Sequence, residues 1–120
     1  MSPSELRTTV RAIGDAAVID MRGEIDGSAE AAMDAGYGEA AAGGQATIVL
    51  NFEAVDYINS TGIAVIVGLL ARARRDGRTI TACGLMDHYR EIFEITRLAD
   101  FMPIFDDEAG AVSDVTARTA

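Results

Sequence analysis

The stretch ATIVLNFEAVDYINSTGIAVIVGLLARARR, residues 46–75, decides the fold. Its run Ile48-Val49-Leu50 lacks polar alternation, which is typical of a central strand buried on both faces. After a predicted loop over 53–58, apolar residues recur at the helical spacing i, i+3, i+4 and i+7, as Ile63, Ile66, Val67 and Leu70. We therefore expect a helix over 60–75 with one stripe facing the core, and a buried strand followed by such a helix favours an α/β fold.

On either side of this stretch, strands and helices alternate. Residues 6–13 and 16–22 alternate apolar and polar side chains around Gly14-Asp15, which predicts two antiparallel strands joined by a tight turn. The further expected elements are a helix capped by Ser28, a strand over 78–83, a helix over 87–96, an edge strand over 102–105, and a last helix from Asp106 or Asp107 to about Val115. This order predicts a mainly parallel sheet of about five strands with an antiparallel N-terminal edge and about four helices.

Length and composition favour one soluble domain. We expect a single domain over 1–120 with its core from about 6 to 115. The net charge of -9 argues against nucleic acid as a partner, because phosphate contacts need clustered cations. The start has no signal-peptide pattern, and the apolar run 63–71 is too short for membrane insertion. With a single Cys83, these features predict a cytoplasmic protein.

The turn Asn59-Ser60-Thr61-Gly62 is the first candidate site. It lies where a buried strand leads into a helix N-terminus, the place where open α/β sheets carry their sites. Free backbone N–H groups and the positive end of the helix dipole would tolerate a phosphate on Ser60. Asn and Ser are also favoured N-cap residues, so the turn by itself is better explained as a helix cap.

The second candidate is the segment Gly23-Glu24-Ile25-Asp26. If its strand neighbours the strand at 48–50, the Asp26 carboxylate would approach Ser60. There it could bind a metal-nucleotide or orient the hydroxyl. From spacing alone, a turn with a surface carboxylate is the more conservative interpretation. The motifs of phosphate-binding loops, nucleophile elbows and zinc proteases are absent, and the lone His88 makes no metal site. We therefore expect no enzyme, no metal and no cofactor.

Two surface features of the helix over 60–75 remain open. A second apolar set lies beside the core stripe and either forms a docking surface or is covered by a neighbouring helix: Ala64, Val65 and Leu69. A cluster of cations at the end of the helix either complements the helix dipole or contacts an acidic partner: Arg72, Arg74, Arg75 and Arg78.

Together these segments resemble the STAS family of anti-sigma factor antagonists. The resemblance is carried by Gly23-Glu24-Ile25-Asp26, by 48–51 with 55–62, and by 93–98 with 101–106, and it covers about 6 to 115. It implies a bacterial module of transcription regulation in stress response. In this family an unphosphorylated antagonist binds an anti-sigma factor that is itself a Ser/Thr kinase. Phosphorylation of a Ser ends the binding, and a phosphatase restores it.

Carried over by position, the resemblance implies that Ser60 is the phosphoacceptor, with Thr61 as second choice. Asp26 matches the family's carboxylate near the phosphosite, and the expected partner-binding set is completed by Asn59, Thr61, Gly62, Val65 and Leu69. The family usually has Asp where this chain has Asn59, a change that bears on kinase recognition or phosphorylation rate. The alternative is a STAS scaffold or transporter-associated binding subunit that is not phosphorylated.

Overall fold

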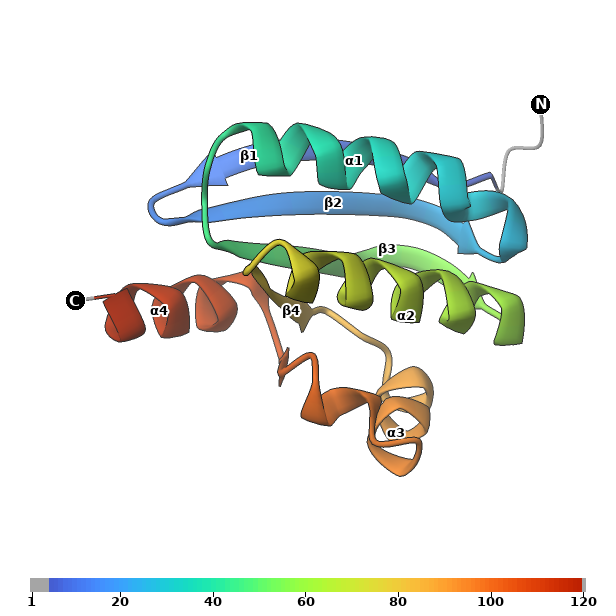
Figure 1. The fold of residues 1–120 in the computed structure, drawn as a ribbon. Coiled ribbons are helices and arrows are strands. Elements are labelled where there is room, and N and C mark those ends of the chain that lie inside the picture. Colours follow the sequence, from blue (N-terminus) through green and yellow to red (C-terminus); the bar gives the residue numbers. More distant parts are fainter. Residues whose placement is uncertain (1–4, 120) are drawn as a thin grey trace.

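A mixed five-stranded sheet forms the centre of the protein (Figure 1). The computed structural model describes residues 5–119. Its strands follow the order of the chain: β1 (Arg7–Ile13), β2 (Ala16–Ile25), β3 (Thr47–Ile58), β4 (Thr79–Cys83) and β5 (Ile104–Phe105). β1 and β2 are antiparallel and all later neighbours are parallel, which confirms the predicted sheet and its antiparallel N-terminal edge.

Four helices cover the sheet in two layers (Figure 1). They are α1 (Glu30–Ala42), α2 (Ser60–Arg75), α3 (Asp87–Ile95) and α4 (Glu108–Thr119), with short 3-10 turns η1 (Gly27–Ala29) and η2 (Leu98–Asp100). α1 and α2 lie side by side over one face, and α4 packs on the other. Within residues 5–119, no helix is both long enough and apolar enough to cross a membrane.

The core is divided between the two faces of the sheet. Alternate residues of the central strands, such as Ile48 and Leu50, pack in the larger cluster beneath α1 and α2. Their neighbour Val49 packs with Cys83 in the smaller cluster beneath α4. Because successive side chains of a strand point to opposite faces, a strand covered on both sides must be apolar at every position. This explains the apolar run Ile48-Val49-Leu50 at the start of β3.

The central strands are longer than the sequence predicted. β2 continues past residue 22 to Ile25, and the predicted loop over 53–58 is instead the second half of β3. The parallel pairing of this extension contains two register shifts, between Asp20 and Arg22 and between Gly23 and Glu24. Such irregularities interrupt the two-residue alternation by which a strand is recognised. The prediction therefore ended both strands where the regular pattern ended.

The first helical segment is capped differently from the prediction. The cap residue is Asp26 and not Ser28, since the Asp26 carboxylate accepts a hydrogen bond from the Ser28 backbone N–H at 2.9 Å. η1 follows, and α1 begins only at Glu30. At α4, Asp107 is the cap, with its Oδ1 2.8 Å from the Gly110 nitrogen, and the helix extends to 119 instead of ending near 115.

The bounds of α2 agree with the prediction, but its buried face does not. The buried side chains include Ile66 and Leu69, whereas Val67, expected in the core stripe, is 47% exposed. Ile63 and Leu70 are only partly buried. The helix is thus rotated so that Gly62 also faces inward.

Gly62 allows α2 to begin directly against the end of β2. A Cβ atom at this position would lie 1.9 Å from the carbonyl oxygen of Ile25, far inside van der Waals contact. The same carbonyl accepts a hydrogen bond from the Asn59 backbone N–H at 3.2 Å. Any side chain at position 62 would push the first turn of α2 away from the sheet.

The substitution Gly62→Ala is expected to lower the free energy of unfolding by about 2–3 kcal/mol, because backbone atoms must move to admit the methyl group. Gly68→Ala is the matched control in the same helix, where a Cβ meets no atom within 4 Å. The control should be neutral or stabilising by up to about 1 kcal/mol, since Ala is the better helix former. Urea denaturation measures both, and equal effects would contradict the close approach.

A charged network fastens α4 to the sheet. Arg11 on β1 contacts Asp20 on β2, with Nε 2.5 Å from Oδ2, and also pairs with Glu108 at the start of α4. Asn51 Nδ2 donates a further hydrogen bond to Asp20 at 3.1 Å. The hydrogen bonds from Arg11 hold the pKa of the Asp20 carboxyl below its ordinary value of 3.8. The ionised form of Asp20 is therefore stabilised by folding.

Asp20→Asn should lower the free energy of unfolding at pH 7 by about 1 kcal/mol, the usual contribution of a partly exposed ion pair. Because the folded-state pKa is depressed, this contribution is complete above about pH 5 and is lost as the pH falls below the unfolded-state value. The stability difference from the unmodified protein should therefore shrink below about pH 4 in urea titrations. Asp100→Asn, in an exposed pair with Arg97, is the control and should cost less at pH 7; an equal cost would contradict the anchoring role.

Candidate functional site

The two candidate segments meet at one edge of the sheet. β2 and β3 are parallel neighbours, and their last residues, Ile25 and Ile58, are paired. Both chains therefore leave the sheet together, one into η1 through Asp26 and the other into α2 through Asn59. Figure 1 shows the starts of α1 and α2 side by side at this end of the molecule. The condition stated for the second candidate, that its strand neighbours the strand containing residues 48–50, is therefore met.

Asn59 is the cap of α2. Its Oδ1 accepts hydrogen bonds from the Gly62 backbone N–H at 2.9 Å and from the Thr61 hydroxyl at 2.7 Å. Its backbone is extended, as expected for a cap residue. The capping interpretation of the turn is thus confirmed for Asn59, and a neutral amide suffices for it.

Thr61 ties the two segments together. Its hydroxyl donates to Asn59 Oδ1 and accepts from the Gly27 backbone N–H at 2.9 Å. A Thr hydroxyl has one hydrogen to donate, and here that hydrogen is used within the fold. The side chain therefore holds η1 against the first turn of α2.

Ser60 differs from both of its neighbours. It is exposed, it is the first residue of α2, and no hydrogen bond within residues 5–115 engages its hydroxyl. The backbone N–H groups of a first helical turn carry partial positive charge. Ser60 thus presents a free nucleophilic oxygen at a position that favours a negative group.

Asp26 brings a negative charge to the same edge. Its Oδ1 accepts from the Ser28 hydroxyl at 2.5 Å and from the Ser28 backbone N–H at 2.9 Å. These bonds lower the pKa of the Asp26 carboxyl, the side-chain bond most strongly, so the group is ionised at neutral pH. Among the described residues, no hydrogen bond joins Asp26 to Ser60, and no cluster of three or more His, Cys, Asp or Glu side chains could hold a metal ion.

The second apolar set of α2 is divided by the fold. Leu69 is buried in the core, so it does not lie on the protein surface, where the sequence analysis placed it as a partner-binding residue. Val65 is half-buried against the core, and Ala64 is exposed. Val67 is the exposed apolar residue that the sequence missed, because its spacing also fits the predicted core stripe.

The arginine cluster is divided in the same way. Arg72 lies over the ring of Tyr37, 4.6 Å from its centroid. Arg78 donates to the carbonyl oxygens of Ala41 and Gln45, each at 3.3 Å. These two cations therefore join α2 and the start of β4 to the region of α1, and they are structural.

Sequence relatives carry antagonist names. The chain is 34% identical over 61 residues to the anti-sigma-B factor antagonist of Staphylococcus aureus, covering 51% of this chain and 56% of that one. It is 32% identical over 75 residues to BtrV of Bordetella bronchiseptica, named as a candidate anti-sigma factor antagonist, covering 62% of this chain and 65% of that one. The matches thus span less than two thirds of either relative's length.

Solved structures share the fold at lower identity, and a family model spans it. An anti-sigma factor antagonist from Mycobacterium paratuberculosis superposes with a TM-score of 0.80 at 19% identity, covering 96% of this chain and 97% of that one. The Bacillus cell fate determinant SpoIIAA in its phosphorylated form gives a TM-score of 0.66 at 22% identity, covering 90% and 98%. The STAS domain model matches residues 7–111, from β1 into α4. A match over this range, with the sheet order and both candidate segments inside it, means that the chain belongs to the STAS domain family.

Proposed function

We propose that this protein is an anti-sigma factor antagonist, a protein-binding switch and not an enzyme, and that phosphorylation of Ser60 by its partner kinase turns it off. The observation that carries the proposal is the exposed Ser60 hydroxyl, free of hydrogen bonds within residues 5–115, at the start of α2. The names of the sequence relatives support the antagonist role. A phosphatase that removes the phosphate would complete the cycle.

The position of Ser60 suits a reversible phosphate. A phosphoserine adds about -1.5 to -2 charges and three acceptor oxygens. At a helix N-terminus, this charge is stabilised by the helix dipole and by free backbone N–H groups. The cap of α2 is made by Asn59, which accepts hydrogen bonds from Gly62 and Thr61, so modification of Ser60 leaves those hydrogen bonds in place. The phosphate therefore changes the surface without unfolding the helix.

Thr61 is the weaker candidate acceptor. Its hydroxyl is engaged on both sides, with Asn59 and with Gly27. Phosphorylation there would break the contact between η1 and α2 before any partner is released. Phosphorylation of Ser60 breaks no such contact, which supports Ser60 as the predicted phosphoacceptor.

The exposed side of α2 supplies a docking surface for the partner. Ala64 and Val67 follow Ser60 at i+4 and i+7, so the three residues share one helical face. An apolar strip that starts at a modifiable Ser lets one partner both bind and reach the hydroxyl. When phosphate is added, the charge would lie at the edge of that interface, beside the ionised Asp26, where its desolvation weakens binding.

Position 59 has two possible roles, capping of α2 and recognition by the kinase, and Asn59 keeps the first while it alters the second. Because its amide oxygen already caps α2, replacement of the family's Asp costs the fold nothing at the cap. We infer that the lost negative charge acts on the kinase alone, through recognition of the turn or the rate of phosphoryl transfer.

Incubation with the cognate anti-sigma kinase and ATP should place one phosphate on Ser60, located by peptide mass mapping. Ser60→Ala should abolish the modification. Ser113→Ala, which removes an exposed hydroxyl from α4, is the matched control and should be phosphorylated normally. Phosphate on Thr61, or none while the kinase is active on another substrate, would refute Ser60 as the acceptor.

Binding to the same kinase should follow the charge at position 60. In calorimetric titrations, Ser60→Ala should bind about as tightly as the unmodified protein. Ser60→Asp should bind at least about tenfold more weakly, because an unpaired carboxylate that loses water at the edge of the interface is costly. Ser113→Asp places the same charge on α4 and should leave affinity unchanged. Equal affinities of the two Ser60 variants would contradict the switch.

A further inference from the structure

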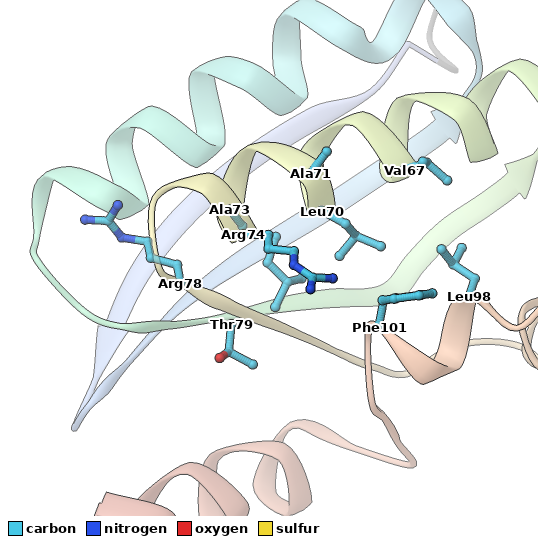
Figure 2. Close-up of a pocket in the computed structure, with 10 residues that line it drawn as sticks. Val67, Leu70, Ala71, Ala73, Arg74, Arg78, Thr79, Leu98 and Phe101 are labelled. Atoms are coloured by element: carbon cyan, nitrogen blue, oxygen red, sulfur yellow. The ribbon is translucent and has the colours of Figure 1, made fainter.

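A concave site lies on the same helix, away from Ser60. Figure 2 shows a pocket between the second half of α2, the start of β4 and the segment around η2, with a cavity volume of about 380 Å³. Its α2 residues begin at Val67 and end at Arg74, so the pocket starts roughly 10 Å along the helix from Ser60. None of the residues that line it belongs to the cap or to η1.

The lining of this pocket is predominantly apolar. Its deeper walls are the buried side chains of Ile80 and Leu98 and the partly buried Leu70. Val67 and Phe101 form its rim and are 47% and 62% exposed. Exposed Val and Phe side chains around a hollow leave apolar surface in water that a ligand could cover.

Arg74 places a positive charge at the mouth. In Figure 2 its side chain extends toward Phe101. Within residues 5–115, no hydrogen bond or ion pair engages its guanidinium, whereas the Arg78 guanidinium on the other side of the pocket is bonded to backbone carbonyls. The chain has 19 acidic residues and 10 basic ones, so acidic partners for an Arg are plentiful. An Arg that is nevertheless unpaired, and that lies beside an apolar cavity, is available to a ligand.

We propose that this pocket binds a small organic anion with an apolar body, of the class of medium-chain carboxylates. The alkyl chain would pack against Leu70, Leu98 and Phe101, and the carboxylate would pair with Arg74. A guanidinium forms two parallel hydrogen bonds with a carboxylate, and a cavity of this volume falls in the range of about 300–1,000 Å³ typical of small-molecule sites. A highly polar anion such as a nucleotide would meet mainly apolar side chains and, among the described residues that line the pocket, only one free cation. The site does not depend on the proposed switch.

The first test is calorimetric titration of the full chain with hexanoate, octanoate and decanoate. Binding should saturate at one ligand per chain, and each added methylene should raise the affinity by about fourfold until the pocket is full. 1-Octanol, with the same body and no charge, should bind at least about tenfold more weakly than octanoate. Absence of saturable binding by all three carboxylates would overturn the proposal.

Variants locate the site. Arg74→Ala should weaken octanoate binding by at least about tenfold, because a charge-assisted hydrogen bond is lost. Arg75→Ala removes the same charge from the next residue of α2, which does not line the pocket, and should change affinity less than twofold. Phe101→Ala should weaken octanoate and decanoate alike, and circular dichroism checks that each variant folds. Equal effects of the two arginine variants would overturn the assignment.

Other occupants give different results. A second copy of the chain could cover the pocket instead. Sedimentation would then show self-association that is abolished by Phe101→Ala but not by octanoate. This result would refute the proposal that a carboxylate occupies the pocket. Amide chemical shifts that move around Ser60 and not around Val67 and Phe101 would place the anion at the helix N-terminus and would equally refute it. None of these experiments uses the kinase, so their failure leaves the proposed switch unaffected.

Discussion

The contact between Gly62 and the carbonyl of Ile25 determines the arrangement of the site. Because position 62 has no side chain, α2 starts against the last residue of β2. At that distance Thr61 reaches the backbone of Gly27, and Asn59 reaches both Thr61 and the helix N-terminus. Ser60, between two residues used by the fold, is left facing outward. One missing Cβ atom thus decides which hydroxyl is structural and which is available.

Local patterns predicted those parts of the fold that depend on local forces. The bounds of α2 follow from its cap and its apolar spacing, and the mainly parallel pairing of the sheet follows from the alternation of strands and helices. The ends of β2 and β3 could not be found in this way, because their extension to Ile25 and Ile58 depends on pairing between strands that are far apart in sequence. The rotation of α2 likewise reflects a tertiary contact at Gly62 that spacing does not reveal.

The candidate site was likewise predicted only in part from the sequence. The sequence identified the turn and the family, and it ranked Ser60 above Thr61 by resemblance alone. The physical difference between these hydroxyls is a hydrogen bond to Gly27, 34 residues away in the chain. The arginines at positions 72, 74 and 78 also look equivalent in sequence, yet Arg72 and Arg78 hold neighbouring elements while the Arg74 guanidinium is left free at a pocket. Only three-dimensional contacts separate a side chain that the fold uses from one that it leaves free.

The length of α2 has an evolutionary consequence. Its 16 residues form a rod roughly 24 Å long, with the capped turn at one end and the pocket wall at the other. Substitutions at Ala71 or Arg74 lie about three turns from the cap hydrogen bonds, a separation at which mutational effects usually add. Related proteins could therefore diverge in what the far end of the helix recognises while inheriting the chemistry of the first turn unchanged.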